Sequence, residues 1–287
     1  MDVVRLSTTY LAEHGSTSAR LDAELLAAHS LGLRRLDLYL QHDRPLADGE
    51  LAPVRALLRR RAAGEPVAYL LGEREFFGRP FSVTPAVLIP RPETETLVER
   101  ALEWARQSAG GAGEGLRIAD LGTGSGCIAC TVAAELPRAA VVAVDLSTGA
   151  LEVAAANAQR LGVGDRVQTV HGSWGEPLRH LERFDAVLSN PPYVTTAELT
   201  ELDRDVRDHE PRLALDGGAD GLDAVRELLA SVRDALHRPA YVALEIDPRR
   251  REGVEMLLRT ALQEATVTVH RDLAGHDRVV EARLAGG

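Results

Sequence analysis

From residue 116 onward, short apolar runs alternate with longer stretches of helical periodicity. Buried strands show such apolar, β-branched runs, whereas helices repeat apolar residues three and four positions apart. The alternation predicts an α/β fold with a mostly parallel sheet covered by helices on both faces. The expected strands are 116–121, 141–145, 167–171, 184–189, 241–246, 267–270 and 279–283, and the expected helices are 126–136, 148–161, 221–236 and 249–263.

The first 74 residues are rich in Leu, Ala and Arg and have helical rather than strand periodicity. One expected apolar face carries Leu21, Leu25 and Ala28, and another carries Leu51, Val54 and Leu58. These residues predict a small helical bundle. The run Arg59-Arg60-Arg61 closes one of its helices. We interpret it as a solvated face that suits the helix C-terminus, and contact with an anionic partner is the alternative.

Residues 75–92 are rich in aromatic residues interrupted by glycine and proline. Phe76-Phe77 and Phe81-Ser82-Val83 flank a Gly-Arg-Pro turn, which is the pattern of a β-hairpin. A helix is expected from Glu93 to about Gln107, because its first turn is acidic. We therefore expect three parts: a helical domain over 1–74, a β-hairpin linker over 75–92 and an α/β domain over 93–287.

Charge and composition argue against two classes of protein, those that bind long nucleic acids and those that span a membrane. The 287 residues carry a net charge of −10 and only 4% aromatic side chains. A protein that binds the phosphate backbone of long nucleic acids needs a clustered basic surface. We therefore expect a protein or a small molecule as the substrate, and no stable nucleic-acid partner. No stretch approaches the roughly 20 apolar residues needed to span a bilayer. Residues 1–10 lack the apolar core of a signal peptide, so we expect a cytoplasmic protein with no membrane partner, and a monomer.

The two cysteines, Cys127 and Cys130, form one Cys-x-x-Cys pair. A structural zinc site needs four ligands, and the nine histidines are scattered without a second paired cluster, so no metal is expected. We interpret the pair as two small residues on the inner face of a helix. A thioredoxin-like redox pair is the alternative.

A glycine-rich loop follows the first expected strand and opens a helix: Asp120-Leu121-Gly122-Thr123-Gly124-Ser125-Gly126. Glycines let the backbone approach a ligand closely, and a helix N-terminus offers free N–H groups, which is typical of a nucleotide site. A dinucleotide-binding site is the alternative for this loop. Its fingerprint requires Gly or Ala where this chain has Cys127, which argues against it. Asp145 ends the next strand, 19 residues after Gly126, where an acid can bind ribose hydroxyls. Capping of the following helix is its alternative role, for which Ser147 competes.

The apolar run 184–188 leads directly into Ser189-Asn190-Pro191-Pro192-Tyr193. Two prolines cannot donate to a sheet, so the strand ends there. The Asn190 side chain and the Asn190 and Pro191 carbonyls offer acceptors, and Tyr193 offers a flat ring. This arrangement suits a planar NH2 group, whose nitrogen would be held toward one electrophile. A strand terminator without chemistry is the alternative.

Together, the glycine loop, Asp145 and the Asn-Pro-Pro-Tyr run resemble the S-adenosylmethionine-dependent amino-methyltransferases. Three further segments, Pro66–Glu73, Leu88–Glu95 and Glu210–Gly218, resemble the release-factor glutamine methyltransferases. The resemblance covers about 66–285, and the N-terminal helices are similar in character only. It implies a Rossmann-like seven-stranded methyltransferase domain and S-adenosylmethionine as the cofactor.

The resemblance also implies a substrate: the glutamine amide in the Gly-Gly-Gln loop of peptide chain release factors, with the N-terminal helical domain recognising the rest of the factor. A ribosomal-protein glutamine or a DNA adenine amino group is the alternative, since both present a planar NH2. The acidic, aromatic-poor chain has no evident domain for reading DNA, which favours the protein substrate. A binding module without activity is a competing class, against which the intact Asn-Pro-Pro-Tyr argues.

By this resemblance the catalytic residues are Asn190, Pro191 and Tyr193, and substrate binding adds Pro192, Arg91 and Glu93. The cofactor-binding residues are Asp120, Gly122, Thr123, Gly124, Ser125, Gly126, Asp145, Leu146, Ser173, Trp174 and Asn190. The chain departs from the family in two places: Ser173 replaces a common acid, and Ile246 follows Glu245 where relatives often have glycine. His171 and His209 are the nearest candidate bases by sequence, and both are interpreted as structural.

Overall fold

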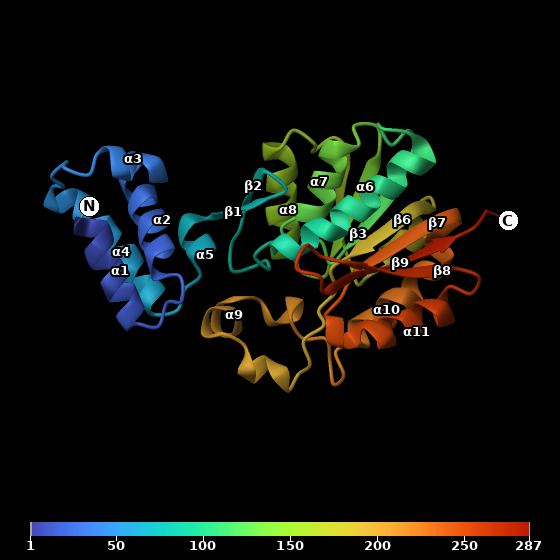
Figure 1. The fold of residues 1–287 in the computed structure, drawn as a ribbon. Helices are drawn as coiled ribbons and strands as arrows, with labels where there is room; N and C mark the ends of the chain where they lie inside the picture. The colour runs from blue at the N-terminus through green and yellow to red at the C-terminus, as the bar shows by residue number, and fades with distance from the viewer. Residues whose placement is uncertain (1, 287) are drawn as a thin grey trace. The chain divides into compact units, whose positions relative to one another are not determined.

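A computed structural model describes residues 2–286, which form two compact units (Figure 1). One unit contains the chain up to Glu73 together with Asp203–His209. The other contains Arg74–Leu202 and the chain from Glu210 onward. Within the described residues, no helix is long and apolar enough to span a bilayer.

The N-terminal unit is helical, as expected. Its core is formed by buried side chains that include Leu11, Ala23, Leu26, Val54 and Leu58. The short helix α9, which is distant in sequence, belongs to the same unit. The helices are α1 (Asp2–Glu13), α2 (Ala19–Leu31), α3 (Arg35–Leu40), α4 (Asp48–Ala62), α5 (Val67–Leu71) and α9 (Arg204–His209).

The expected apolar face of α2 is partly wrong. Leu21 is 43% exposed, whereas Ala23, Leu26 and Ala27 are fully buried. The helix contacts α1, α3, α4 and α5, so it is buried over most of its circumference, and Leu21 lies on the strip that remains exposed. On α4 the expected face is correct for Val54 and Leu58, which are buried.

The interpretation of Arg61 as part of a solvated face is also wrong. Its Nε donates a hydrogen bond of 2.8 Å to Oδ2 of Asp22, and only 12% of the Arg61 side chain and 6% of the Asp22 side chain are exposed. Ser16 and Ser18 donate to the same carboxylate. Arg61 is therefore a buried ion-pair partner that joins α4 to α2.

The hairpin forms a two-stranded sheet of β1 (Glu73–Phe76) and β2 (Arg79–Ser82). Its turn is Phe77-Gly78 and not the expected Gly-Arg-Pro, because both central residues have positive φ, 52° and 69°. A tight hairpin turn that matches the strand twist requires this conformation. Pro80 consequently lies in the second strand.

The larger unit contains a seven-stranded sheet in the order β5-β4-β3-β6-β7-β9-β8. The neighbours from β5 to β7 are parallel, and β9 is antiparallel to both β7 and β8. The sheet is thus mostly parallel, as predicted. The strands are β3 (Arg117–Leu121), β4 (Ala140–Asp145), β5 (Val167–His171), β6 (Phe184–Ser189), β7 (Leu236–Glu245), β8 (Thr266–Arg271) and β9 (Asp277–Leu284).

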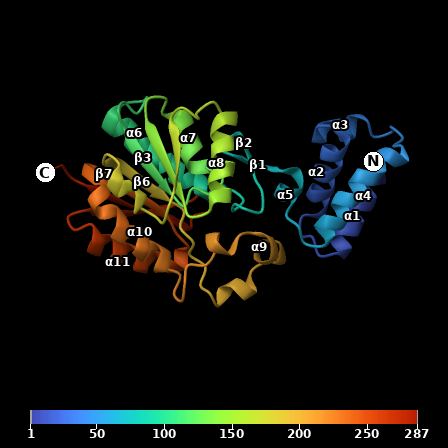
Figure 2. The same cartoon turned by 180° about the vertical axis from the view of Figure 1, so that it is seen from behind.

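Helices cover both faces of this sheet (Figures 1 and 2). Apolar side chains of α6 (Glu95–Ala109), α7 (Cys127–Glu135) and α8 (Thr148–Arg160) share one core with the sheet. Those of α10 (Asp223–Val232) and α11 (Arg251–Ala261) share the core on the other face. The 3₁₀ turns are η1 (Pro92–Thr94), η2 (Pro177–His180), η3 (Glu198–Glu201), η4 (Arg212–Ala214), η5 (Arg233–Ala235) and η6 (Pro248–Arg250).

The strand order reverses beside β3. From β3 the chain proceeds outward through β4 to β5 and then returns to β6 on the other side of β3. In open parallel sheets, ligands bind at the carboxyl ends of the strands next to such a reversal. Three of the motifs found in the sequence follow β3, β4 and β6, so the topology brings them to one edge.

Candidate active site

The glycine loop connects β3 to α7, and its backbone is fixed by the neighbouring strand. The N–H groups of Gly122 and Thr123 donate to the carbonyl of Val144 at 2.9 and 3.0 Å. Gly122, Gly124 and Gly126 all have positive φ, which explains the Gly-x-Gly-x-Gly spacing. Apart from the two neighbours of Gly124 in the chain, none of residues 2–286 has an atom within 4 Å of the place where a Cβ on Gly124 would be, so the loop leaves open space there.

Asp120 is completely buried at the base of this loop. Its Oδ2 accepts hydrogen bonds from the Thr123 hydroxyl at 2.6 Å and from the Ala129 N–H at 3.1 Å. Within residues 2–286, Oδ1 has no hydrogen-bond partner. Burial raises the pKa of Asp120 to about 7. A buried acceptor without a partner is costly, so this oxygen is suited to a donor from a ligand.

Asp145 holds the loop from the end of β4. Its Oδ2 accepts from the Gly124 N–H at 2.9 Å, and its Oδ1 accepts from the Ser147 N–H at 2.8 Å. The capping role belongs to Ser147, whose hydroxyl accepts from the Ala150 N–H at 3.2 Å. Each Asp145 oxygen keeps a lone pair for a further donor. Leu146, the next residue, is 51% exposed.

Trp174 lies beside the glycine loop. A Cβ on Gly122 would be 3.5 Å from its indole ring, and its Nε1 donates to Glu227 at 3.1 Å. The preceding Ser173 is half-buried, and its carbonyl accepts from the Glu176 N–H. Of the two residues after β5 that were expected to bind the cofactor, Trp174 therefore lies at the loop. His171 is exposed, and its Nε2 lies 3.0 Å from the carbonyl oxygen of Leu146.

Asn190 follows β6, whose end is tied to β3 by a 2.6 Å hydrogen bond from the Ser189 hydroxyl to the Leu121 carbonyl. The side-chain amide of Asn190 donates from Nδ2 to the hydroxyl of Thr94 at 3.2 Å. No hydrogen bond to Asn190 Oδ1 is made by any residue from 2 to 286. The side-chain oxygen is therefore available as an acceptor.

Two glycines pack against the backbone of the Asn-Pro-Pro-Tyr segment. A Cβ on Gly217 would lie 2.7 Å from the Pro192 carbonyl oxygen, and one on Gly221 would lie 2.4 Å from the Tyr193 carbonyl oxygen. The Gly217 N–H also donates to the carbonyl of Val194 at 2.7 Å. Close backbone packing thus explains why this part of the chain requires glycine.

Arg91 is held by Glu210, whose side chain is almost completely buried. The guanidinium contacts Oε1 of Glu210 at 2.5 Å, and the Ile89 N–H donates to Oε2 at 3.1 Å. This carboxylate joins the two segments that resemble the family motifs. Burial raises the pKa of the half-buried Tyr193, so its hydroxyl stays neutral. Glu93 and Pro192 lie in the same region, exposed and half-buried respectively.

The chain is similar to known proteins over most of its length. Residues 2–72 match the PrmC N-terminal domain, and residues 108–210 match the methyltransferase small domain. A release factor glutamine methyltransferase of Geobacter sulfurreducens is 45% identical over 96% of this chain and 93% of its own length. The chain belongs to the release factor glutamine methyltransferase family. A Bradyrhizobium diazoefficiens protein of the same name is 43% identical over 92% of this chain and 88% of its own.

A solved methyltransferase structure from Pyrococcus furiosus shares the fold of this family member. It is 19% identical, has a TM-score of 0.53, and the alignment covers 81% of this chain and 98% of the other. The Rossmann-like methyltransferase fold with a helical N-terminal region is thus confirmed, and so is the family expected from the sequence.

Two residues of this methyltransferase beside Asn190 were not identified as site residues from the sequence. Thr94 is 2% exposed and Glu245, at the end of β7, is 1% exposed. Burial raises the pKa of Glu245 to about 7, and within the described residues its Oε2 has no hydrogen-bond partner. In the sequence, Glu245 stands out only because Ile246 follows it where relatives often have glycine. The only signal in the sequence was an acid at the end of an expected strand. Asp247 caps η6 by accepting from the Arg249 N–H at 2.8 Å.

The cysteines of this methyltransferase are buried in α7, and burial raises the pKa of both thiols, that of Cys130 to about 12. Thiols in this state are poor nucleophiles, which agrees with the packing interpretation and not with a redox pair. Across residues 2–286, no group of three His, Cys, Asp or Glu side chains is arranged to hold a metal ion.

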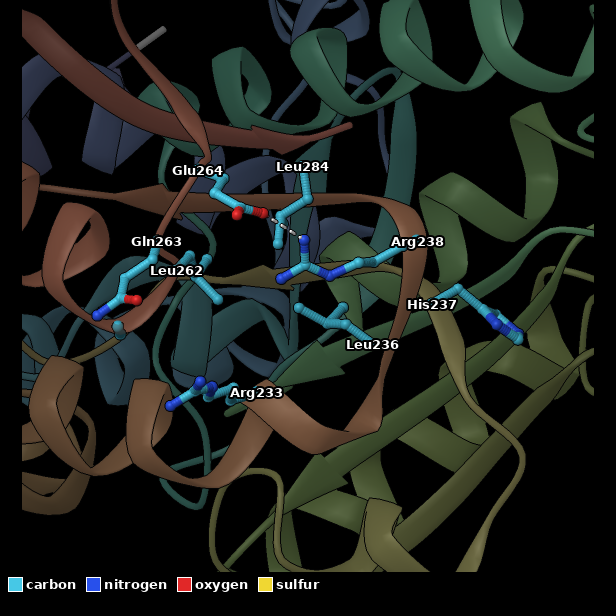
Figure 3. A pocket seen from close by; sticks show the side chains of 9 residues that line it. Arg233, Leu236, His237, Arg238, Leu262, Gln263, Glu264 and Leu284 are labelled. Carbon is cyan, nitrogen blue, oxygen red and sulfur yellow. Dashed lines mark hydrogen bonds and ion pairs between the residues drawn. The ribbon is translucent and has the colours of Figure 1, made fainter. Parts of the chain in front are cut away.

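A cavity of about 230 Å³ lies at the start of β7, at the end of the strand away from Glu245 (Figure 3). An ion pair of 2.9 Å between Arg238 and Glu264 crosses it. Because the glycine loop and Asn190 follow the carboxyl ends of their strands, this cavity is separate from the candidate active site.

Proposed function

We propose that this methyltransferase transfers a methyl group from S-adenosylmethionine to the side-chain amide nitrogen of the glutamine in the Gly-Gly-Gln loop of peptide chain release factors. The observation that carries the proposal is the orientation of Asn190, whose Nδ2 is engaged by Thr94 while its Oδ1 is left to accept. Family membership supports the same reaction, since the relatives are named release factor glutamine methyltransferases.

The residues at the carboxyl edge of the sheet fit S-adenosylmethionine, which supplies a methyl group on a positively charged sulfur. Asp120 has an unpartnered buried oxygen, Asp145 has lone pairs to spare for ribose hydroxyls, and open space lies beside Gly124. We assign binding of the cofactor to Asp120, Gly122, Thr123, Gly124, Ser125, Gly126, Asp145, Leu146, Ser173, Trp174 and Asn190.

The protein must make an amide nitrogen reactive, although its lone pair is delocalised into the carbonyl. Asn190 Oδ1 and the Pro191 carbonyl accept the two amide hydrogens, which draws charge onto the nitrogen and fixes its direction. Tyr193 packs on the amide plane, and Pro192, Arg91 and Glu93 border the substrate. The nitrogen's proton leaves to water, and no side chain is assigned as its base.

The N-terminal helical domain, residues 1–74, is assigned to recognition of the rest of the release factor, and the hairpin over 75–92 connects it to the methyltransferase domain, 93–287. A substrate of the translation machinery implies a cytoplasmic enzyme. We further propose a monomer without a stable nucleic-acid or membrane partner. The net charge of −10 supports the absence of a nucleic-acid partner.

The experiment that tests the substrate is mass spectrometry of a purified release factor after incubation with the enzyme and S-adenosylmethionine. We expect the Gly-Gly-Gln peptide to gain the mass of one methyl group on its glutamine. A ribosomal protein and an adenine-containing DNA duplex serve as parallel substrates. Label only in DNA adenine, or only in a ribosomal-protein glutamine, would reject the release factor as the substrate.

Replacement of Asp145 tests the cofactor site. Asp145→Ala removes an acceptor for the ribose and for the Gly124 N–H, so S-adenosylhomocysteine should bind about 1–3 kcal/mol more weakly. Titration calorimetry measures this change. Ser147→Ala is the matched control, because it removes the α8 cap and should lower stability by about 1 kcal/mol while leaving cofactor affinity nearly unchanged. Equal losses of affinity in the two variants would contradict the assignment.

A further inference from the structure

Glu245 lies beside Asn190 on the same face of the sheet. β6 and β7 are parallel, and Leu188 of β6 pairs with Ala243 of β7. Both of these side chains belong to the core that the sheet shares with α6 and α7. Side chains on one face of a strand recur every second residue, so Asn190 and Glu245 follow this pair on the same face. The hydrogen bond from Asn190 to Thr94, just before α6, agrees with this placement.

The carboxylate of Glu245 is buried with one oxygen unused. Only 1% of the residue is exposed, and no residue from 2 to 286 makes a hydrogen bond to its Oε2. Glu281, a second buried acid of the same sheet, differs: its Oε1 accepts from Arg283 and its Oε2 accepts from Tyr241, each at 2.9 Å. A buried acceptor without a partner is costly. Oε2 of Glu245 is therefore suited to a donor that a ligand brings.

The order of the strands indicates which ligand this is. The glycine loop, Asp145 and Trp174, which are assigned to the cofactor, follow β3, β4 and β5, and these three strands lie on one side of β6. β7 is the neighbour of β6 on the other side, so Asn190 stands between the cofactor segments and Glu245. A donor that reaches Glu245 past Asn190 belongs to the substrate and not to the cofactor.

The proposed reaction releases one proton, for which the acceptors of the substrate amide are unsuited. The substrate nitrogen uses its lone pair in the new N–C bond, and the electron pair of the broken S–C bond stays on the sulfur. One N–H bond must then give up its proton. Asn190 Oδ1 and the Pro191 carbonyl are amide oxygens, which accept hydrogen bonds but are too weakly basic to take a proton. A carboxylate can act as such a base.

We propose that Glu245 is a catalytic residue whose Oε2 takes the proton from the substrate amide nitrogen before that proton passes to water. This inference rests on the proposed function, because it needs a glutamine amide bound at Asn190. The electron pair of the broken N–H bond returns to the nitrogen, and an O–H bond forms at Oε2. The positive sulfur and the negative carboxylate are thus both neutral after the step. While positive charge moves onto the nitrogen, the carboxylate also attracts it.

The surroundings of Glu245 suit a base that becomes neutral. Burial disfavours the ionised form and raises the pKa of Glu245 to about 7. The groups that face it are Arg278 of β9, Arg91 and Glu93 before α6, Tyr193 after β6 and Cys127 of α7. The two arginines lower this pKa without cancelling the effect of burial. Glu245 can take a proton only when it is ionised, so the single-turnover rate with both substrates saturating should decrease as pH falls through about 7.

Glu245→Gln tests the inference in the full-length enzyme with a release factor and S-adenosylmethionine. Glutamine keeps the size and an acceptor oxygen but cannot take the proton, so the single-turnover rate should fall by about 100-fold and its decrease at acidic pH should vanish. Titration calorimetry should show nearly wild-type affinity for S-adenosylhomocysteine. Glu281→Gln is the matched control, because it alters a buried, fully partnered acid of the same sheet. It should lower stability and leave the rate and its pH profile unchanged.

Glu245→Asp keeps a carboxylate on a shorter side chain, so it should be faster than Glu245→Gln. A wild-type rate in Glu245→Gln, or a rate in Glu245→Asp no higher than that of Glu245→Gln, overturns the inference. Where neither variant folds, the wild-type enzyme decides, since a single-turnover rate that stays constant as pH falls through about 7 also overturns it. A wild-type enzyme that labels no release factor contradicts the proposed function instead, so the two failures are distinguishable.

Discussion

Asn190→Ala is expected to lower turnover by about 100- to 1,000-fold while the protein remains folded and binds S-adenosylhomocysteine. Removal of one preorganised polar group that acts in a transition state has an effect of this size in other enzymes. The side chain is half-buried, and its one hydrogen bond within the described chain runs to Thr94. Its loss should therefore affect chemistry more than stability. Single-turnover kinetics with a release factor measure the methyl-transfer step directly.

Asn190→Asp is the matched variant, because it keeps the shape and the acceptor oxygens but adds a negative charge next to the buried Glu245. Like charges close together disfavour ionisation of both groups, so we expect Asn190→Asp to be impaired most at high pH. Near-normal turnover of Asn190→Ala would remove Asn190 from the chemistry. Unfolding of Asn190→Ala would show that the residue is needed for the fold, and the catalytic assignment would fail.

Local patterns were sufficient to predict much of the sheet. The strands Val167–His171 and Phe184–Ser189 begin and end where the sequence indicates. Each is a short run of β-branched or apolar residues that ends at a change of composition. By contrast, β7 begins at Leu236 and not at the expected residue 241, because His237, Arg238 and Pro239 hide its start from any apolar pattern.

In the segment after Asn-Pro-Pro-Tyr, apolar periodicity does not predict the helix α9 that the structure contains. α9 has no buried residue, and acidic and basic side chains flank its single apolar residue, Val206, so no apolar face marks it as a helix. Leu21 shows the opposite problem: a regular apolar spacing that ends up exposed, because four other helices of the unit already enclose the remainder of α2. Tertiary packing decides both cases.

The candidate site divides in the same way. The glycine loop, Asp145 and Asn190 could be proposed because each is a recognisable motif at the end of a strand. Thr94 and Glu245 could not be placed beside Asn190, because the position of Glu245 depends on the order of β6 and β7 in the sheet and the Thr94–Asn190 hydrogen bond depends on the position of η1. Strand order is a long-range property that a single sequence does not reveal.

Arg61→Ala is expected to lower the free energy of unfolding of the N-terminal unit by about 3–5 kcal/mol, since it leaves the buried carboxylate of Asp22 without its charged partner. Ser16 and Ser18 still donate to Asp22, which favours the lower end of this range. The unit has its own apolar core, so the loss should be largest there. Hydrogen exchange of the α2 and α4 amides measures this loss of stability, and exchange of the amides in the seven-stranded sheet measures the stability of the other unit separately.

Arg60→Ala is the matched control for this prediction. Arg60 is the neighbouring residue in the same helix and pairs with Glu65, but 53% of its side chain is exposed. Because solvent screens such a pair, its loss should cost no more than about 1 kcal/mol. Equal protection of the α2 amides in the two variants would mean that the Asp22 carboxylate finds water or another donor. If residues 1–74 recognise the release factor, Arg61→Ala should also raise the KM for the factor. Its affinity for S-adenosylhomocysteine should stay unchanged, because the residues assigned to the cofactor belong to the unit with the seven-stranded sheet.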